Sequence, residues 1–321
     1  MSTIIDVAKK ANVSKQTVSR VINNSSSVNE KTKIKVLEAI KELNYHPNYM
    51  ARVLKSNQSK SIGFIISDSE NIFYTRIANT LQNLLNQDRY SLFVLYSDED
   101  SKNLEKGFEY MFEKCVDVIL FTPPIDSTTI ADKLKHQGVK AIQLFRKIIP
   151  DIPAIIADDE QGAYIATKEL IENGHKKISM FVGPYESENR RKNGYEKAFH
   201  EFGLPLDENF YLILSGDKSS QVKEAQKHIE LYKPTAIISV SSPIEYVTIK
   251  ALNLSQKQIK DDISLLCYDD NDLTQLFDIT TIGHNIQEIC TVIKSSIFDD
   301  IKEDVLVTPY LNKRKSIKKV D

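Results

Sequence analysis

The sequence IIDVAKKANVSKQTVSRVIN, residues 4–23, predicts two short helices joined by a tight turn. Apolar residues recur at helical spacing over residues 4–11, and this pattern stops at Asn12. Ser14 is a favourable N-cap for a second helix, which we expect to run to about Asn23. Two helices that meet in this way predict a helix-turn-helix, in which the second helix enters the major groove of DNA.

The expected second helix has one apolar and one polar face. Its apolar face carries Val18, Val21 and Ile22. Its polar face carries Lys15, Gln16, Ser19 and Arg20. Arginine pairs bidentately with guanine and glutamine with adenine, so these side chains suit base reading in the groove. The alternative interpretation of this face is a solvated helix surface.

A third helix is expected to begin at Asn29 and to complete a three-helix core. Its apolar positions are Ile34, Val36, Leu37, Ile40 and Leu43. The region is also basic, because residues 1–60 contain 11 Lys and Arg against 4 Asp and Glu, a net of +7. The rest of the chain has 31 against 40, a net of -9, although the whole chain has only -2. A basic head favours nucleic acid or an anionic membrane surface as its partner.

A membrane partner is not expected from the rest of the sequence. No apolar run is long enough to span a bilayer, and residues 1–6 lack the features of a signal peptide. We therefore expect a cytoplasmic protein. Its three cysteines, Cys115, Cys267 and Cys290, lie far apart and are interpreted as buried free thiols.

Residues 61–321 alternate apolar, strand-like runs with helical segments. The runs are residues 62–66, 91–95, 116–121 and 141–145 in the first half, and 177–182, 210–214, 235–240 and 263–267 in the second. Buried strands that alternate with helices predict an α/β fold with parallel sheets covered on both faces. Two such lobes form a clamshell, with ligands expected in the cleft beyond the carboxyl ends of the strands.

Motifs along the chain closely resemble the LacI/GalR family of bacterial transcription regulators. In the head these are Asp6-Val7-Ala8, Val13-Ser14, residues 16–23, Lys31-Thr32 and Leu43-Asn44-Tyr45-x-Pro47-Asn48, and in the body they include Gly174-His175, Tyr268-Asp269-Asp270 and Thr280-Thr281-Ile282. The resemblance implies a small all-α helix-turn-helix DNA-binding domain at residues 1–46. It further implies a hinge helix and linker at residues 47–60, and a two-lobed, periplasmic-binding-protein-like effector-binding and dimerisation domain at residues 61–321.

The resemblance also implies the residues that contact DNA. Lys15, Gln16 and Arg20 would read the major groove, with Thr17, Ser19 and Asn23 nearer the backbone. In the hinge, Leu54 matches the wedge that enters the minor groove, with Arg52 and Lys55 beside it. The segment 47–56 is too short to be a stable helix alone, so the alternative for it is a solvated linker.

The implied effector-binding residues are Phe73, Tyr74, Arg146, Arg191, Asp269 and His284. The alternatives are that Arg191 bridges to a neighbouring carboxylate and that Asp269 caps a helix. The chain also departs from the family pattern, with Ser241-Ser242 for Asn-Asp, Phe145 for Asp, and Cys267 and Cys290 for Gly. These departures leave open an altered or phosphorylated sugar, a non-sugar effector, or a weakened response.

Enzymatic and metal-binding functions find no support in the sequence. No two of the ten glycines are closer than nine residues, so neither a G-x-G-x-x-G nor a Walker loop is present. The histidines and cysteines lack zinc-site or triad spacing. Three acidic clusters at residues 98–100, 158–160 and 269–272 lack EF-hand spacing, so we interpret them as loop and helix-start acids. We expect no enzyme, no catalytic residue, no metal and no cofactor.

The combined expectation is a homodimeric repressor of a carbohydrate-utilisation operon. It would bind near-palindromic double-stranded operator DNA and be released by a small-molecule effector, a sugar or sugar phosphate. One alternative is a co-repressed or phosphoprotein-assisted regulator. Another, from a different class, is a solute-binding protein that shares the clamshell fold, but such a protein does not account for the basic head.

Overall fold

The computed structural model describes residues 2–22, 27–45, 58–127, 134, 136–184, 190–299 and 303–320. The chain divides into two compact units, Met1–Ser59 and Lys60–Asp321, which we call the headpiece and the body. The predicted DNA contacts Asn23, Arg52, Leu54 and Lys55 lie outside the described residues. No helix in the described part of the chain is long and apolar enough to cross a membrane.

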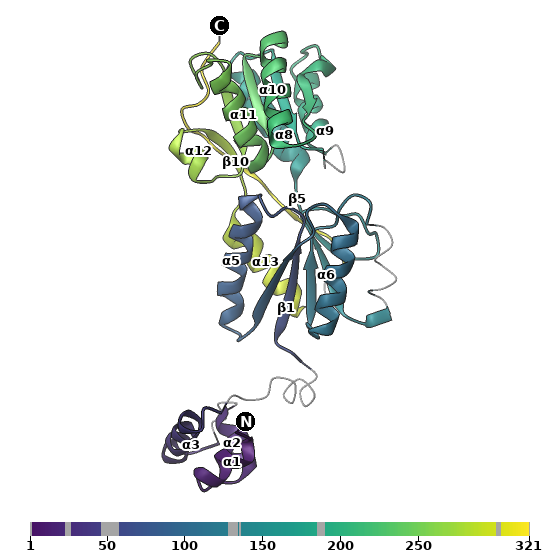
Figure 1. Cartoon of the computed structure of the whole chain (residues 1–321). Helices are drawn as coiled ribbons and strands as arrows, with labels where there is room; N and C mark the ends of the chain where they lie inside the picture. The colour runs from purple at the N-terminus through teal and green to yellow at the C-terminus, as the bar shows by residue number, and fades with distance from the viewer. Residues whose placement is uncertain are drawn as a thin grey trace. The chain divides into compact units, whose positions relative to one another are not determined.

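The headpiece contains the three expected helices (Figure 1), which are α1 (Ile4–Lys10), α2 (Lys15–Ile22) and α3 (Glu30–Glu42). Thr3 and Asp6 form a capping box at the start of α1. The turn after α1 uses Asn12 in the left-handed region, with φ 52°, which asparagine tolerates well. There the amide of Val13 donates to the carbonyl of Ala8 at 3.0 Å and closes the helix end.

The core of the headpiece uses one stripe from each helix. Its buried residues are Val7, Ala8, Ala11, Val18, Val21, Val36, Ala39 and Tyr45. The prediction that Ile34 and Leu37 belong to this core is wrong, because they are 50% and 48% exposed. At 100° per residue both lie off the stripe of Val36, Ala39 and Ile40 that faces α1 and α2.

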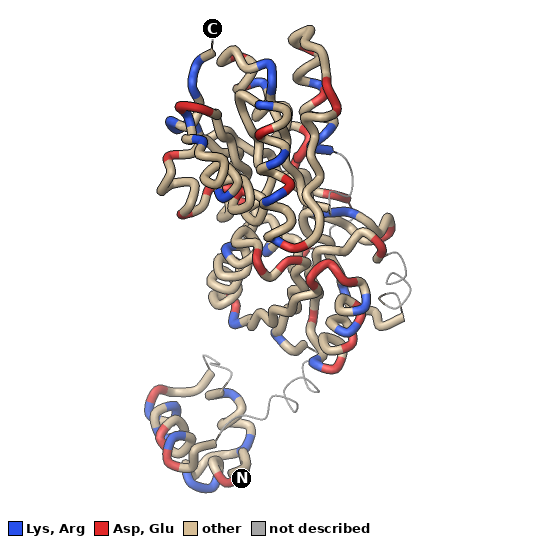
Figure 2. Tube along the Cα trace, turned by 45° about the horizontal axis from the view of Figure 1, so that its top comes forward, with Lys and Arg blue, Asp and Glu red and all other residues tan. Residues whose placement is uncertain are grey.

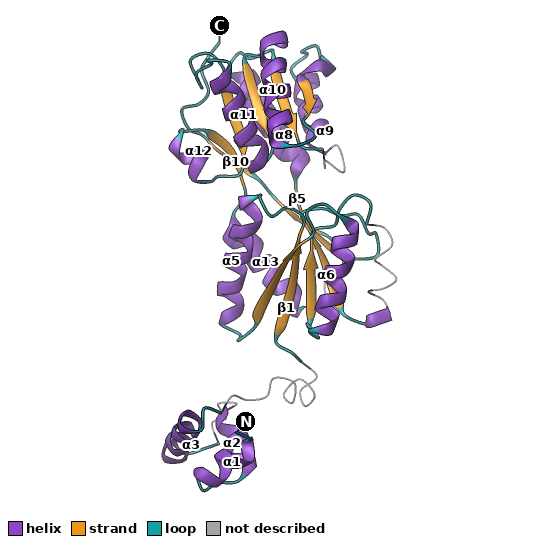
Figure 3. Ribbon diagram, in the orientation of Figure 1, coloured by secondary structure: helices purple, strands orange, loops and turns teal. Residues whose placement is uncertain are grey.

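The first lobe of the body is a six-stranded parallel sheet of order β11-β5-β4-β3-β1-β2. Its strands are β1 (Ser61–Ile66), β2 (Ser91–Tyr96), β3 (Val118–Phe121), β4 (Lys140–Leu144), β5 (Ala154–Ala157) and β11 (Val305–Val307). Helices α5 (Ile72–Asn86) and α13 (Ile286–Phe298) cover one face, and α6 (Ser101–Glu113) covers the other (Figure 3). The apolar character of the strands on both faces follows from this double cover.

The second lobe has a similar six-stranded sheet of order β12-β10-β9-β8-β6-β7, in which the edge strand β12 is antiparallel to β10 and the other strands are parallel. Its strands are β6 (Ile178–Val182), β7 (Tyr211–Ile213), β8 (Ala236–Ser239), β9 (Ser264–Tyr268), β10 (Thr280–Gly283) and β12 (Tyr310–Asn312). Helices α8 (Asp159–Glu172) and α9 (Arg190–Glu201) pack on one face, and α10 (Lys218–Tyr232) and α11 (Ser242–Leu254) on the other. The short helices η1 (Glu208–Phe210) and α12 (Asp272–Leu276) lie in connections.

The pattern of apolar runs predicted one lobe from each half of the sequence. The structure divides the chain differently. The chain passes between the lobes after β5, after β10 and after β11, so α13 and β11 return to the first lobe. Each of the eight predicted runs contains a strand, whereas β5, β10, β11 and β12 were not predicted.

The cysteine prediction holds for two of the three thiols. Cys267 and Cys290 are buried and free, whereas Cys115 is free but exposed. Cys115 follows α6 in a turn with φ 51°, where its side chain leaves the apolar core. Burial raises the pKa of Cys290 to about 12, so this thiol stays protonated and acts as a small apolar residue.

Candidate functional site

The exposed face of α2 carries the side chains that the sequence selected for DNA contact. Lys15, Gln16 and Arg20 are exposed, whereas Thr17 and Ser19 are half-buried. The Ser14 hydroxyl accepts a hydrogen bond from the amide of Thr17 at 3.0 Å, which confirms the predicted N-cap. The buried Val18 and Val21 fix the opposite face against the headpiece core.

This face of α2 is suited to a polyanion. Lys15, Gln16 and Arg20 make no side-chain hydrogen bond or ion pair with any residue that the structure describes, so their donors are available to a ligand. The first turn of α2 holds no acidic residue, and the helix dipole adds positive potential at this end. Figure 2 shows lysine and arginine along the headpiece helices, with acidic residues between them.

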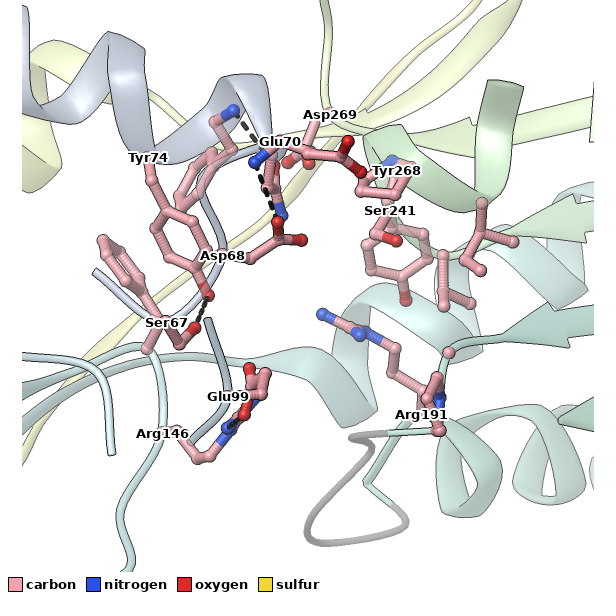
Figure 4. Close-up of a pocket in the computed structure, with 18 of the residues that line it drawn as sticks. Ser67, Asp68, Glu70, Tyr74, Glu99, Arg146, Arg191, Ser241, Tyr268 and Asp269 are labelled. Atoms are coloured by element: carbon pink, nitrogen blue, oxygen red, sulfur yellow. Dashed lines mark hydrogen bonds and ion pairs between the residues drawn. The ribbon is translucent and has the colours of Figure 1, made fainter. Parts of the chain in front are cut away.

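The body holds a cleft of about 840 Å³ between its lobes, at the carboxyl ends of the strands. All six residues that the sequence selected for effector binding line it, namely Phe73, Tyr74, Arg146, Arg191, Asp269 and His284. Each follows a strand closely or begins the next helix, which is the expected position for ligand-binding groups in open α/β sheets. Figure 4 shows residues of both lobes around this space.

Arg146 in the first lobe forms a bidentate ion pair with Glu99. Its Nη1 and Nη2 atoms lie 2.8 and 3.0 Å from the two carboxylate oxygens of Glu99, and Nη1 also donates to the carbonyl of Pro123 at 2.9 Å. The side chains are only 14% and 7% exposed. This parallel geometry is the strong form of a guanidinium–carboxylate contact.

Arg191 in the second lobe pairs with Asp159, as the alternative interpretation of this residue proposed. Its Nε and Nη2 atoms donate to the same oxygen of Asp159 at 3.1 and 2.9 Å. The guanidinium carbon lies 5.0 Å from the centre of the Tyr268 ring, in cation–π range. Figure 4 shows the Arg191 side chain extending into the open space.

Two carboxyl groups with raised pKa values, those of Asp269 and Glu245, lie beside the second-lobe wall. Burial raises the pKa of Asp269 to about 7, with a further increase from Asp159 and an opposing effect of Arg191. Glu245 is fully buried, and burial raises its pKa to about 7 as well. One of its oxygens accepts from Nδ2 of Asn271 at 2.8 Å, while the other has no hydrogen-bond partner among the described residues. The helix cap proposed as an alternative for Asp269 is supplied by Asn271.

Aromatic rings form the first-lobe wall. The ring centroids of Phe73 and Phe145 are 4.9 Å apart, and that of Tyr74 is 5.6 Å from that of Phe145. His284 stands beside them, with its ring centroid 6.0 Å from that of Phe73. Burial lowers the pKa of His284 to about 4, so its ring is neutral. Neither ring nitrogen has a hydrogen-bond partner in the described part of the chain.

Two contacts join the lobes at the cleft. Lys218 of α10 lies 2.8 Å from Glu70 of the first lobe, and Nη1 of Arg76 donates to the carbonyl of Asp270 in the second. The lobes are thus held together on two sides of the space that a ligand would occupy. Sequence reasoning selected none of these four residues.

The sequence analysis also missed the carboxylates that partner the two arginines. It interpreted the acidic clusters as loop and helix-start acids, which is confirmed for Asp100 and Asp158, the N-caps of α6 and α8. Their neighbours Glu99 and Asp159 instead pair with arginines in the cleft. The usable signal was position, because both acids follow the carboxyl end of a parallel strand. The described residues contain no group of three or more His, Cys, Asp or Glu placed to hold a metal ion.

Comparisons with known proteins cover almost the whole chain. A family model described as bacterial regulatory proteins, lacI family, matches residues 3–48, and one described as periplasmic binding proteins and sugar binding domain of LacI family matches residues 59–293. The HTH-type transcriptional regulator DegA of Bacillus subtilis (strain 168) is 29% identical over 297 residues, 90% of this chain and 88% of the relative. The HTH-type transcriptional repressor PurR of Aliivibrio salmonicida (strain LFI1238) is 31% identical over 314 residues, 94% and 93% of the two chains. A crystal structure of the lac repressor dimer bound to operator and the anti-inducer ONPF aligns with a TM-score of 0.84 and 25% identity over 99% of both chains.

Proposed function

Because the chain belongs to the LacI family of bacterial regulatory proteins, whose members are DNA-binding transcriptional regulators, we propose that it represses a carbohydrate-utilisation operon and is released by a small molecule bound in the cleft. The observation that carries this proposal is the joint presence of an exposed polar face on α2 and a ligand-sized cleft in the body. Coupling between two such sites in one chain typically amounts to about 1–3 kcal/mol.

The DNA half of the proposal assigns base reading to Lys15, Gln16 and Arg20, with Thr17 and Ser19 supporting the helix. A bidentate base contact is worth about 1–3 kcal/mol, so Arg20→Ala should weaken binding to a selected near-palindromic site about tenfold or more. Binding to random DNA should change far less. Lys41→Ala, on α3 and exposed, is the matched control that removes the same kind of charge outside α2.

The test is fluorescence anisotropy with a site selected from random duplexes, at several salt concentrations. The same assay is applied to the alanine variants of Asn23, Arg52, Leu54 and Lys55. DNA bending is also compared between Leu54→Ala and the wild-type protein. A wild-type protein that binds the selected and random duplexes equally would refute the proposal. Equal losses on both duplexes for Arg20→Ala would make it a phosphate contact instead.

A homodimer is part of the proposal, because a two-fold protein suits a palindromic site. Large apolar side chains on α11 and at the end of α12 are exposed in the body, and they suit a contact with a second copy. They are Tyr246, Leu254, Leu276 and Phe277, with Leu276 76% exposed. Light scattering after size-exclusion chromatography measures the mass, and a monomer at micromolar concentration would contradict this part.

The sign of the effector's action separates induction from co-repression. We expect the effector to lower operator affinity, as an inducer does. An effector that raises operator affinity would instead identify a co-repressed regulator. Titrating ligands into the anisotropy assay gives this sign directly.

A further inference from the structure

Three of the four cations that line the cleft are already bound to acids of the cleft. Arg146 holds Glu99, Arg191 holds Asp159 and Lys218 holds Glu70, at 2.8–2.9 Å for the shortest contacts. A phosphorylated ligand would have to displace one of these carboxylates before it could bind the corresponding cation. His284 adds no positive charge, because its ring is neutral.

The acids that line the cleft outnumber its cations. Seven carboxylates line the space, those of Asp68, Glu70, Asp98, Glu99, Asp159, Asp217 and Asp269, against the four cations Arg146, Arg190, Arg191 and Lys218. Three acids are neutralised by the pairs just described, and Asp217 is held by the amide of Ser220 as the N-cap of α10. The cleft therefore has a net negative charge.

Asp68 and Asp269 are the two acids of the cleft whose charged forms are most disfavoured by this excess of negative charge. Asp68 follows β1 and accepts from the amide of Glu70 at 2.9 Å, whereas Asp269 follows β9 on the opposite wall. Burial raises the pKa of the Asp68 carboxyl, and Glu70, Glu99 and Asp98 nearby raise it further. Figure 4 shows the carboxylates of Asp68 and Asp269 beside the open space. A cation between the two walls would relieve both acids.

The aromatic residues of the cleft indicate a ligand that is larger than a simple cation. Phe73, Tyr74 and Phe145 present aromatic surface in the first lobe, and Tyr268 does so in the second. Aromatic rings bind the apolar faces of sugar rings and also attract ammonium groups. The ligand must therefore combine a ring with a positive charge.

We propose that the effector is an amino sugar or a similar polyol bearing a protonated amine, with Asp68 and Asp269 binding the ammonium group. The inference rests on the proposed function of the cleft and names the ligand class for it. It departs from the sugar phosphate that the sequence left open, because the cleft offers an ammonium group more acids than cations, and three of its four cations are already held in ion pairs that a phosphate would have to break.

The test compares matched sugars. Glucose, glucosamine and glucose 6-phosphate form one set, and galactose and mannose with their 2-amino and 6-phosphate derivatives form two more. The thermal unfolding midpoint is measured for each, because a ligand of the folded state raises it. In at least one set the amino sugar should raise the midpoint more than its parent sugar, and no phosphate should exceed its parent. The opposite order, or no response to any amino sugar, would overturn the inference.

Variants then locate the amine. Asp68→Asn and Asp269→Asn should each weaken binding of the responding amino sugar about tenfold by calorimetry, and should weaken it more than they weaken binding of the parent sugar. Asp261→Asn, an exposed acid of the second lobe outside the cleft, should leave both affinities unchanged. Unchanged amino-sugar binding in both cleft variants would overturn the assignment.

Operator binding measured in parallel separates the two proposals. A protein that prefers its palindromic site but responds to no amino sugar retains the proposed function and loses this inference. A protein that shows no such preference loses the proposed function, whereas the thermal midpoints still report whether the cleft prefers an amine.

Discussion

The two lobes of the body share a strand order but form unlike walls of the cleft. Both use an arginine beside a carboxylate at the strand ends, Arg146 with Glu99 and Arg191 with Asp159. In the first lobe the pair is bidentate and more buried, and aromatic rings line the same wall of the cleft. In the second lobe one carboxylate oxygen receives both bonds, and the acids Asp269 and Glu245 form no ion pair with any residue that the structure describes.

This difference indicates a division of labour within one repeated fold. In the first-lobe wall the Arg146–Glu99 pair is complete, so the aromatic residues of this wall can act as a preformed surface against which a ring packs. The second-lobe wall keeps carboxyl groups whose charge is costly in the empty cleft, so its energy depends on what occupies the space. A ligand can shift the equilibrium between two states only through such differences in interaction energy.

Breaking the two arginine pairs should give the largest contrast between the lobes. Arg146→Met should lower the free energy of unfolding of the body by about 3 kcal/mol, because it leaves Glu99 buried without its cation. Arg191→Met should lower it by about 1 kcal/mol, because both bonds of that pair go to one carboxylate oxygen and the pair is more exposed. Urea unfolding followed by circular dichroism measures both values.

Lys192→Met is the control for these variants. Lys192 directly follows Arg191 in α9 and forms a more exposed ion pair, with Glu196. It should change the free energy of unfolding by less than about 0.5 kcal/mol. Adding Glu99→Gln to Arg146→Met should recover part of the loss, since the buried charge is then removed. Equal losses for Arg146→Met and Arg191→Met would contradict the contrast between the walls.

The sequence predicted the headpiece helices and the α/β character of both lobes, because those depend on local periodicity and capping. Ser14 and Asn29 are examples of caps that local pattern identifies. It did not predict the return of α13 to the first lobe or the partners of Arg146, because these contacts join segments far apart in the chain. Charge balance in the cleft depends on such distant pairs, so it became visible only in the structure.

Glu245 allows a second test, which concerns only the second-lobe wall. The folded-state pKa of this carboxyl is raised to about 7 from an ordinary value of 4.5, so the folded protein binds more protons than the unfolded chain between these values. Its contribution to stability therefore falls as pH rises from 5 to 8. Glu245→Gln keeps an acceptor for Asn271 and removes the charge.

We expect Glu245→Gln to raise the free energy of unfolding at pH 8 by about 2 kcal/mol and to change it little at pH 5. Urea unfolding at both pH values gives the comparison. Glu224→Gln, on the exposed face of α10, supplies the control at each pH. A variant that is less stable than wild type at pH 8 would show that the carboxylate has a partner that compensates its burial.

The smallest effect should come from the ion pair that spans the walls, Lys218 with Glu70. Both side chains are at least half exposed, so the pair is worth about 0.5 kcal/mol and its loss should barely alter stability. Because the pair forms only when the lobes approach, Lys218→Glu should instead favour opening and weaken ligand binding about twofold to threefold. The reversed pair Glu70→Lys with Lys218→Glu should restore affinity, and calorimetry measures it. An affinity that stays low in the reversed pair would mean that Lys218 acts on the ligand itself rather than on closure of the cleft.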